Sequence, residues 1–106
     1  MTTTDKIQEA AARLHAARPD ATIILFGSRA RGDARPDSDA DFLVVVPRPP
    51  ASTRQAMVEL MDELRPLRVP ADVLVLSAAR FRQRAGVPGT LCHTALREGK
   101  VLYGSL

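Results

Sequence analysis

Two aspartates at the start of an apolar run are the residues of this chain whose type and spacing best suit chemistry. Asp39 and Asp41 lie two positions apart where the run that ends at Val46 begins. On a strand, this spacing points both carboxylates to the same face, roughly 6.6 Å apart along the chain. Carboxylates at the mouth of a buried strand are costly unless positive charge lies between them. Basic side chains could supply that charge, and so could a divalent cation such as Mg²⁺, which takes carboxylate and phosphate oxygens as ligands.

A glycine turn before these aspartates has the composition of a phosphate-binding site. Gly27 and Ser28 directly follow the apolar run that ends at Phe26. Glycine allows close approach of the backbone to another group, and the residues after it can present the amide groups of a helix N-terminus. The turn is therefore a candidate cradle for phosphate.

Two arginines and a serine in the same stretch are candidates for contact with a nucleotide. The guanidinium groups of Arg29 and Arg31 match the geometry of phosphate oxygens. An alternative for one of them is an ion pair with Asp33 or Asp37 that anchors the loop. Ser38 is expected to cap a turn rather than act as a nucleophile, because the sequence places no base beside it.

This pattern resembles the signature of the minimal nucleotidyltransferases, small members of the polymerase-beta-like superfamily. The matching residues are Gly27-Ser28, Ala30-Arg31-Gly32 and Ser38-Asp39-Ala40-Asp41. Phe42 stands where the family more often has leucine, and it keeps an apolar strand position. Many members are antitoxins paired with HEPN-domain toxins. The resemblance covers many fixed positions and is far more specific than a single glycine motif.

The resemblance implies Mg²⁺-dependent nucleotidyl transfer through two ions, with ATP as the donor. Asp39 and Asp41 would bridge the ions, and Asp72 would ligate the ion that activates the acceptor hydroxyl or would accept its proton. The residues expected to bind the nucleotide are Gly27, Ser28, Arg29, Arg31 and Ser38. In the antitoxin branch, the acceptor would be a tyrosine of a cognate HEPN ribonuclease toxin, which would also bind this chain.

Asp72 has two interpretations from the residues alone. It lies at the start of an apolar run in which alternation places Asp72, Leu74 and Leu76 on one face. It could face solvent where the strand begins, because Pro70 and Ala71 are still typical of a turn. It could instead join the other two aspartates in one acidic cluster, as the resemblance implies.

The elements that must position these residues follow from periodicity, caps and turn residues. Strands are predicted over residues 21–26, 39–46, 69–76 and 100–103. Helices are predicted over residues 4–17, 28–31, 53–64, 77–85 and 90–98, with Thr4 and Ser52 as N-caps and a break at Gly86–Gly89. The inward stripe of the helix over 53–64 is predicted to contain Met57, Leu60, Met61 and Leu64. This order indicates a small α/β domain with one mixed sheet flanked by helices, as in polymerase-beta-like nucleotidyltransferases.

Length and composition narrow the class of protein. The 106 residues suffice for one domain, residues 1–106, and the net charge of +3 does not by itself indicate nucleic-acid binding. No apolar run of about 18 residues predicts a membrane span, and the N-terminus does not resemble a signal peptide. Cys92 is the only cysteine, which excludes an internal disulfide and fits a reducing cytoplasm.

Several other residues have simpler interpretations than catalysis. His15, near the end of a helix, fits an electrostatic role there better than that of a catalytic base. Cys92 and His93 are adjacent and would point to different faces of a helix, which does not favour a zinc site. The basic cluster consists of Arg80, Arg82 and Arg84. It is typical of a solvated face, and its alternatives are contact with substrate phosphate or with an acidic partner.

Two functions of other classes compete with protein nucleotidylation. The chain could be an antitoxin that binds and masks a toxin without essential chemistry, or its acidic strand ends could be merely solvated. A small-molecule or RNA acceptor is a further alternative within the enzyme class. The short chain favours the antitoxin branch over antibiotic nucleotidyltransferases, which usually carry an additional substrate domain.

Overall fold

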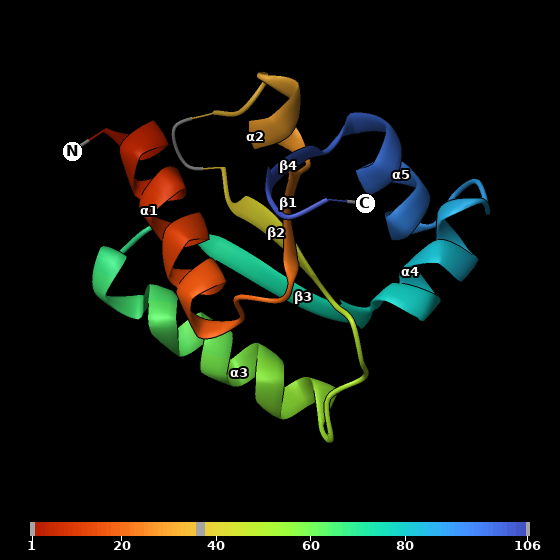
Figure 1. The fold of residues 1–106 in the computed structure, drawn as a ribbon. Coiled ribbons are helices and arrows are strands. Elements are labelled where there is room, and N and C mark those ends of the chain that lie inside the picture. The colour runs from red at the N-terminus through yellow and green to blue at the C-terminus, as the bar shows by residue number, and fades with distance from the viewer. Residues whose placement is uncertain (1, 36–37, 106) are drawn as a thin grey trace.

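A four-stranded sheet in the order β3-β2-β1-β4 forms the centre of the computed structural model, which describes residues 2–35 and 38–105 (Figure 1). The elements in chain order are α1 (Thr3–Ala17), β1 (Thr22–Phe26), α2 (Ser28–Arg31), β2 (Ala40–Val46), α3 (Thr53–Leu64), the 3₁₀ turn η1 (Arg65–Leu67), β3 (Ala71–Ser77), α4 (Ala78–Ala85), α5 (Leu91–Glu98) and β4 (Lys100–Tyr103). Strands β1–β2 and β1–β4 are antiparallel, whereas β2–β3 is parallel. The mixed sheet predicted from the sequence is confirmed.

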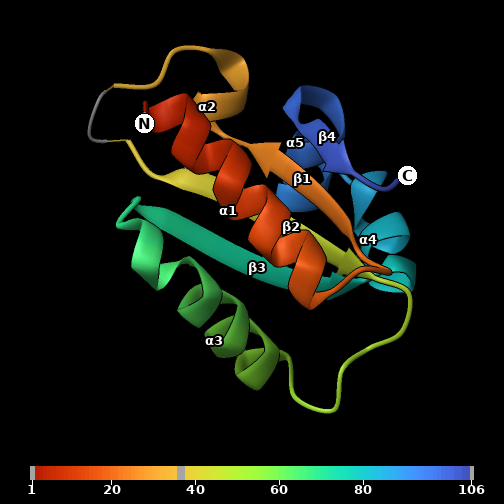
Figure 2. The same ribbon diagram turned by 60° about the vertical axis from the view of Figure 1, so that its left-hand side comes forward.

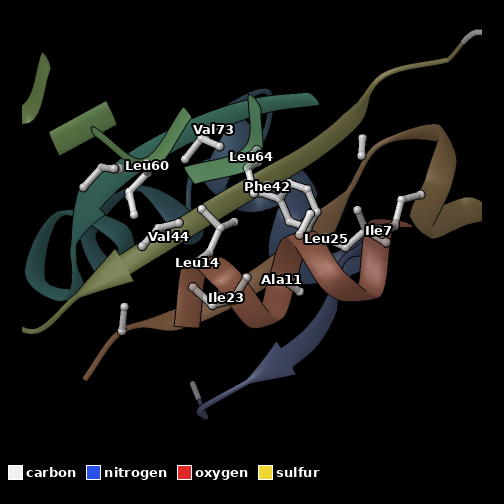
Figure 3. Close-up of a cluster of buried hydrophobic side chains, with 14 of the residues drawn as sticks. Ile7, Ala11, Leu14, Ile23, Leu25, Phe42, Val44, Leu60, Leu64 and Val73 are labelled. Carbon is white, nitrogen blue, oxygen red and sulfur yellow. The ribbon is translucent and has the colours of Figure 1, made fainter. Parts of the chain in front are cut away.

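Helices α1 and α3 cover one face of the sheet, as Figure 2 shows. Strand alternation sends Phe42 and Val44 of β2 toward these helices, where they meet Leu14 of α1 and Leu60 of α3 (Figure 3). All four side chains are almost fully buried. Removal of this apolar area from water is the main force that holds the layer together.

Helices α4 and α5 lie on the opposite face and cover a smaller core. Leu43 of β2 and Ile24 of β1 pack there with Phe81 of α4 and Cys92 of α5. This layer covers the edge strand β3 incompletely, since Leu74 and Leu76 on the same face remain only partly buried.

The parallel β2–β3 pair is what brings distant parts of the chain to one end of the sheet. A parallel connection needs a crossover, and α3 supplies it. Both strands consequently begin at the same end of the sheet, with Asp41 directly opposite Asp72 in the register. Strand β2 begins at Ala40, whose amide donates to the carbonyl of Pro70 at 2.9 Å.

Several local predictions differ from the structure. The N-cap of α1 is Thr2 rather than Thr4, because Thr2 and Asp5 form a reciprocal capping box. Met61 is 36 % exposed, because the buried stripe of α3 repeats every four residues through Ala56, Leu60 and Leu64. Strand β3 begins two residues later than predicted, after Pro70, which has no amide proton for the ladder.

Two helix ends agree with the predicted signals, and one differs. Ser52 accepts a hydrogen bond from the Gln55 amide and caps α3, and α2 has the predicted bounds. Thr90 is the N-cap of α5 rather than its first residue.

In residues 2–35 and 38–105, no helix is both long and apolar enough to cross a membrane.

Candidate active site

Asp41 and Asp72 are direct neighbours across the parallel strands β2 and β3. Asp41 lies on the sheet face of α4 and α5, since the alternate residues Leu43 and Val45 belong to that core. On its other side, Asp41 is paired with Phe26, the last residue of β1. The carboxylate therefore lies where three strands and the β1–α2 turn meet.

Two other carboxylates influence the charge of Asp41. The pKa of Asp41 is raised, first by its partial burial and then by the negative charges of Asp72 and Asp39. Asp39 precedes β2 instead of lying within it, and both Asp39 and Asp72 are exposed to solvent. Asp72 faces solvent at the start of its strand, and it is the direct neighbour of Asp41 across β2 and β3.

Gly27 brings the backbone of the β1–α2 turn directly against this carboxylate. Its φ of +76° and ψ of −156° lie in a region open essentially to glycine alone. A Cβ atom built on Gly27 would overlap the Oδ2 atom of Asp41. The glycine carbonyl accepts hydrogen bonds from the amides of Ala30 and Arg31, each at 3.1 Å, and so starts α2. Ser28 is the first residue of that helix.

Both arginines of the loop hold it in place. The Nη2 group of Arg29 donates to the Ser38 carbonyl at 3.0 Å. The Nε group of Arg31 lies 3.3 Å from Oδ2 of Asp33, which confirms the predicted anchoring ion pair for one of the arginines. Asp37, the other proposed partner, lies outside the described residues.

A second partner of Arg31 could not be anticipated from the sequence. The Nη1 group of Arg31 lies 3.4 Å from Oε2 of Glu98, the last residue of α5. The two residues are 67 positions apart, and no local pattern signals their pairing. Arg31 is also close enough to Asp41 for its charge to oppose the rise in the pKa of that carboxyl. The loop, α5 and the carboxylates are therefore electrostatically connected through one guanidinium group.

Ser38 caps a turn, as predicted. Its Oγ atom accepts a hydrogen bond from the Arg35 amide at 2.8 Å, and its own amide donates to the Arg35 carbonyl at 3.0 Å. This arrangement fixes the backbone that leads into Asp39 and leaves the hydroxyl oxygen engaged. It supports a structural role for the serine side chain in the loop.

Removal of the Arg31 charge is expected to raise the pKa of Asp41 further. In Arg31→Met, the carboxyl keeps its burial and its two acidic neighbours but loses the cation that favours its ionised form. A carbon-13 NMR titration of the aspartate carboxyls would measure the shift. Arg97→Met, which changes an exposed arginine of α5, serves as the control. An unchanged Asp41 titration in Arg31→Met would contradict this account.

The remaining histidines and the cysteine have roles in packing. The ring of His15 stacks on Tyr103, with centroids 4.4 Å apart and planes within 7° of parallel. His93 Nδ1 lies 2.9 Å from the Ala85 carbonyl and ties α5 to α4. Cys92 is buried, and burial raises the pKa of its thiol. The described part of the chain contains no group of three or more His, Cys, Asp or Glu residues able to hold a metal.

The same finding limits what the three aspartates could hold without a substrate. They do not form a complete set of protein ligands among the described residues. Mg²⁺ is, however, commonly held by one or two carboxylates together with substrate phosphate oxygens. A half-buried carboxylate with two acidic neighbours and a raised pKa is suited to such a shared site. The geometry can therefore accept a cation that arrives with a phosphate ligand.

Comparison with known proteins identifies the family. Residues 5–102 match the nucleotidyltransferase domain family. Similar solved structures include a protein described as a minimal nucleotidyltransferase, with 28 % identity and a TM-score of 0.63 over 94 % of this chain and 95 % of the other. A toxin–antitoxin structure with AMP-PNP has 26 % identity and a TM-score of 0.65 over 92 % of this chain and 73 % of the other.

A more distant structure shares the fold alone. It is a spectinomycin adenyltransferase from Enterococcus, with ATP and spectinomycin, at 19 % identity and a TM-score of 0.62. The similarity covers all of this chain and 57 % of that enzyme. Among proteins with curated functions, none matches this chain in sequence. Since the family match spans residues 5–102 of 106, the chain belongs to the nucleotidyltransferase domain family.

Proposed function

We propose that residues 1–106 form one nucleotidyltransferase domain that transfers AMP from ATP with the help of Mg²⁺. The observation that carries the proposal is the position of Asp41. Its carboxylate lies beside Asp72, interacts with Asp39 and touches the backbone turn at Gly27. Metal-assisted nucleotidyl transfer is favoured by three features together. The chain belongs to the nucleotidyltransferase domain family, acidic residues lie at one end of the sheet, and a glycine turn lies beside them.

In this proposal two carboxylates hold the cations, and a third accepts the proton of the acceptor hydroxyl. Asp39 and Asp41 would hold two Mg²⁺ ions together with the phosphate oxygens of ATP. When bound, the ions would neutralise charge on the phosphate during an in-line displacement in which pyrophosphate leaves. Asp72 would contribute to the same site and would accept the proton of the attacking hydroxyl.

The loop residues would hold the nucleotide. Gly27 lets the chain pass close to Asp41, so that phosphate bound at the turn would lie next to the carboxylates. Ser28 would contribute its hydroxyl and its amide. Arg29 and Arg31 would offer guanidinium groups to phosphate oxygens, and Ser38 would keep the loop in shape through its turn.

We further propose that the chain is an antitoxin and that its acceptor is a protein. One similar structure is a toxin–antitoxin with AMP-PNP, an ATP analogue, which supports both a protein partner and an adenine nucleotide. The specific acceptor, a tyrosine of a HEPN ribonuclease toxin, follows from the resemblance of the signature residues. AMP on that tyrosine would neutralise the toxin, and we expect both proteins to act in the cytoplasm.

A small-molecule acceptor is the second candidate. It is supported by the shared fold with an enzyme whose structure contains ATP and spectinomycin. That enzyme is longer than this chain, which covers 57 % of it. An RNA acceptor, or an antitoxin that acts by masking alone, would give different results in the test below.

Intact-mass spectrometry tests the proposal. The purified product of the neighbouring gene would be incubated with this chain, ATP and Mg²⁺, beside matched reactions with Asp39→Asn or with EDTA. We expect one or more AMP units on the product in the complete reaction only. A stable complex without a mass change would favour masking. No complex and no mass change would overturn the antitoxin proposal and favour a small-molecule or RNA acceptor.

A further inference from the structure

A hollow of about 600 Å³ lies beside the edge strand β3 and does not include the turn at Gly27. Its walls come from β3, the end of α4 and the start of α5. We call it the β3 groove, and its side chains include Leu74, Leu76, Arg84, Val87, Leu91 and Cys92. The groove has an apolar floor and one cationic wall.

The apolar side chains of the β3 groove are unusually accessible to water. Val87 is 51 % exposed and Leu91 is 40 % exposed. Leu74 and Leu76 are only partly buried, because the layer of α4 and α5 covers β3 incompletely. Strand β3 is also at the edge of the sheet, with β2 as its single strand neighbour in the described residues. An apolar edge of this kind invites association with another polypeptide.

The groove is held in shape by hydrogen bonds at the junction of α4 and α5. The hydroxyl of Thr90 lies 2.9 Å from the Arg84 carbonyl and 2.8 Å from the Val87 carbonyl. His93 Nδ1 lies 2.9 Å from the Ala85 carbonyl. Val87 is therefore presented to solvent by a fixed backbone. A preformed wall reduces the entropy cost of binding.

One arginine of α4 gives the groove its charge. Arg84 lines the groove and is exposed to solvent, whereas Arg82, two residues earlier, lines a different hollow beside Pro19 and Gly104. Helix α4 carries no acidic residue. A guanidinium group beside an apolar surface complements a carboxylate on a partner, and arginine is common in protein interfaces.

The groove lies on the sheet face that carries Asp41 and Asp72. Leu74 and Leu76 lie on the same face of β3 as Asp72, so the first of them is about 6.6 Å along the strand from that carboxylate. A chain segment in the groove would consequently bring its neighbouring residues to the carboxylates. This nearness to Asp72 distinguishes the groove from an exposed apolar surface that has no part in the reaction.

We propose that the β3 groove binds the acceptor protein through a segment with apolar side chains flanked by acidic ones. The apolar side chains fill the floor beside Leu74 and Val87, and an acidic one pairs with Arg84. The inference rests on the proposed function, because it names where the protein acceptor binds. It adds that the surface that binds the acceptor protein is distinct from the turn at Gly27 and Ser28.

Binding of the purified neighbouring gene product, without nucleotide, tests the proposal by isothermal titration calorimetry. Val87→Asp is expected to weaken binding by about tenfold or more, as for loss of an apolar anchor. Arg84→Glu is expected to weaken it by about threefold to tenfold and to reduce its dependence on salt. The matched controls on α3, Val58→Asp and Arg54→Glu, change equally accessible side chains on the opposite face and should leave affinity within about twofold.

The outcomes separate this proposal from the proposed function. Wild-type binding that Val87→Asp and Arg84→Glu leave unchanged would overturn the groove and leave the antitoxin proposal standing. No wild-type binding would overturn both. Groove-dependent binding without AMP transfer would support the groove and overturn the catalytic part of the proposed function. If Val87→Asp instead dissociates a dimer of this chain in light scattering and spares partner binding, the groove is a self-association surface and the proposal is wrong.

Discussion

Asp41→Asn is expected to abolish AMP transfer, with a loss of about a thousandfold or more. The substitution keeps the size of the side chain and removes the negative charge that we assign to a Mg²⁺ ligand. Charge stabilisation by a bound ion supplies several kcal/mol to such a transition state, which corresponds to a loss of about this size. Steady-state transfer to the acceptor protein, measured by mass spectrometry, would give the rate. Transfer at the wild-type rate would refute the role assigned to Asp41.

The same variant is expected to stabilise the metal-free protein at neutral pH. Burial and two acidic neighbours raise the pKa of Asp41, so its ionised form is less favourable in the folded chain than in the unfolded chain. A group of this kind favours folding below its unfolded pKa, and that contribution is lost as pH rises through its folded pKa. We therefore expect the Tm of Asp41→Asn to be higher than that of the unmodified chain at pH 7, as measured by thermal denaturation.

The pH dependence provides the control for this second result. Below the unfolded pKa of aspartate, the carboxyl is neutral in both states and the difference from Asp41→Asn should vanish. Asp20→Asn, which changes an exposed aspartate in the turn after α1, should leave Tm unchanged at every pH. Loss of stability in Asp41→Asn at pH 7 would show that the carboxylate is structural and would contradict the electrostatic account.

Gly27→Ala is expected to combine a large loss of transfer with a loss of stability. The backbone conformation at Gly27 is strained for any side chain, at a cost of about 1–3 kcal/mol. The new methyl group would also push against Oδ2 of Asp41. A displaced carboxylate changes the geometry of the site, for which we expect a loss of transfer of about a hundredfold. Thermal denaturation and the mass assay would measure the two effects.

Gly32→Ala separates backbone strain from contact with the carboxylate. Gly32 also has a positive φ, +84°, but a Cβ atom there would meet nothing within 4 Å. We expect about 1 kcal/mol of destabilisation from the backbone alone and little change in transfer. Equal losses of transfer in the two variants would indicate that loop strain, and not the position of Asp41, limits the reaction.

The elements that could be predicted from the sequence are those with local signals. The helix Ser28–Arg31 follows a glycine turn, and Ser52 has the side chain that an N-cap requires, so both were anticipated. The error at α1 was also local. Thr2, Thr3 and Thr4 are all possible caps, and the choice depends on Asp5, which lies three residues after Thr2 alone.

The contacts that could not be predicted depend on long-range geometry. Sequence alternation placed Asp72 on a strand face but could not place that strand next to β2, and the resemblance supplied this step. The Arg31–Glu98 pair joins a loop to the end of a distant helix. The β3 groove exists because α4 and α5 stop short of the sheet edge, which no periodicity indicates. The residue types therefore indicated which chemistry the site could perform, whereas the fold determined which side chains lie together.

The parallel pairing of β2 with β3 has a consequence for the order in which the chain folds. Asp41 and Asp72 meet only after α3 has closed the crossover, a non-local step that is intrinsically slow. Their mutual repulsion therefore opposes the pairing of β2 with β3 and not the pairing of β1 with β2. A cation held between them would relieve this repulsion and would thereby stabilise the folded chain.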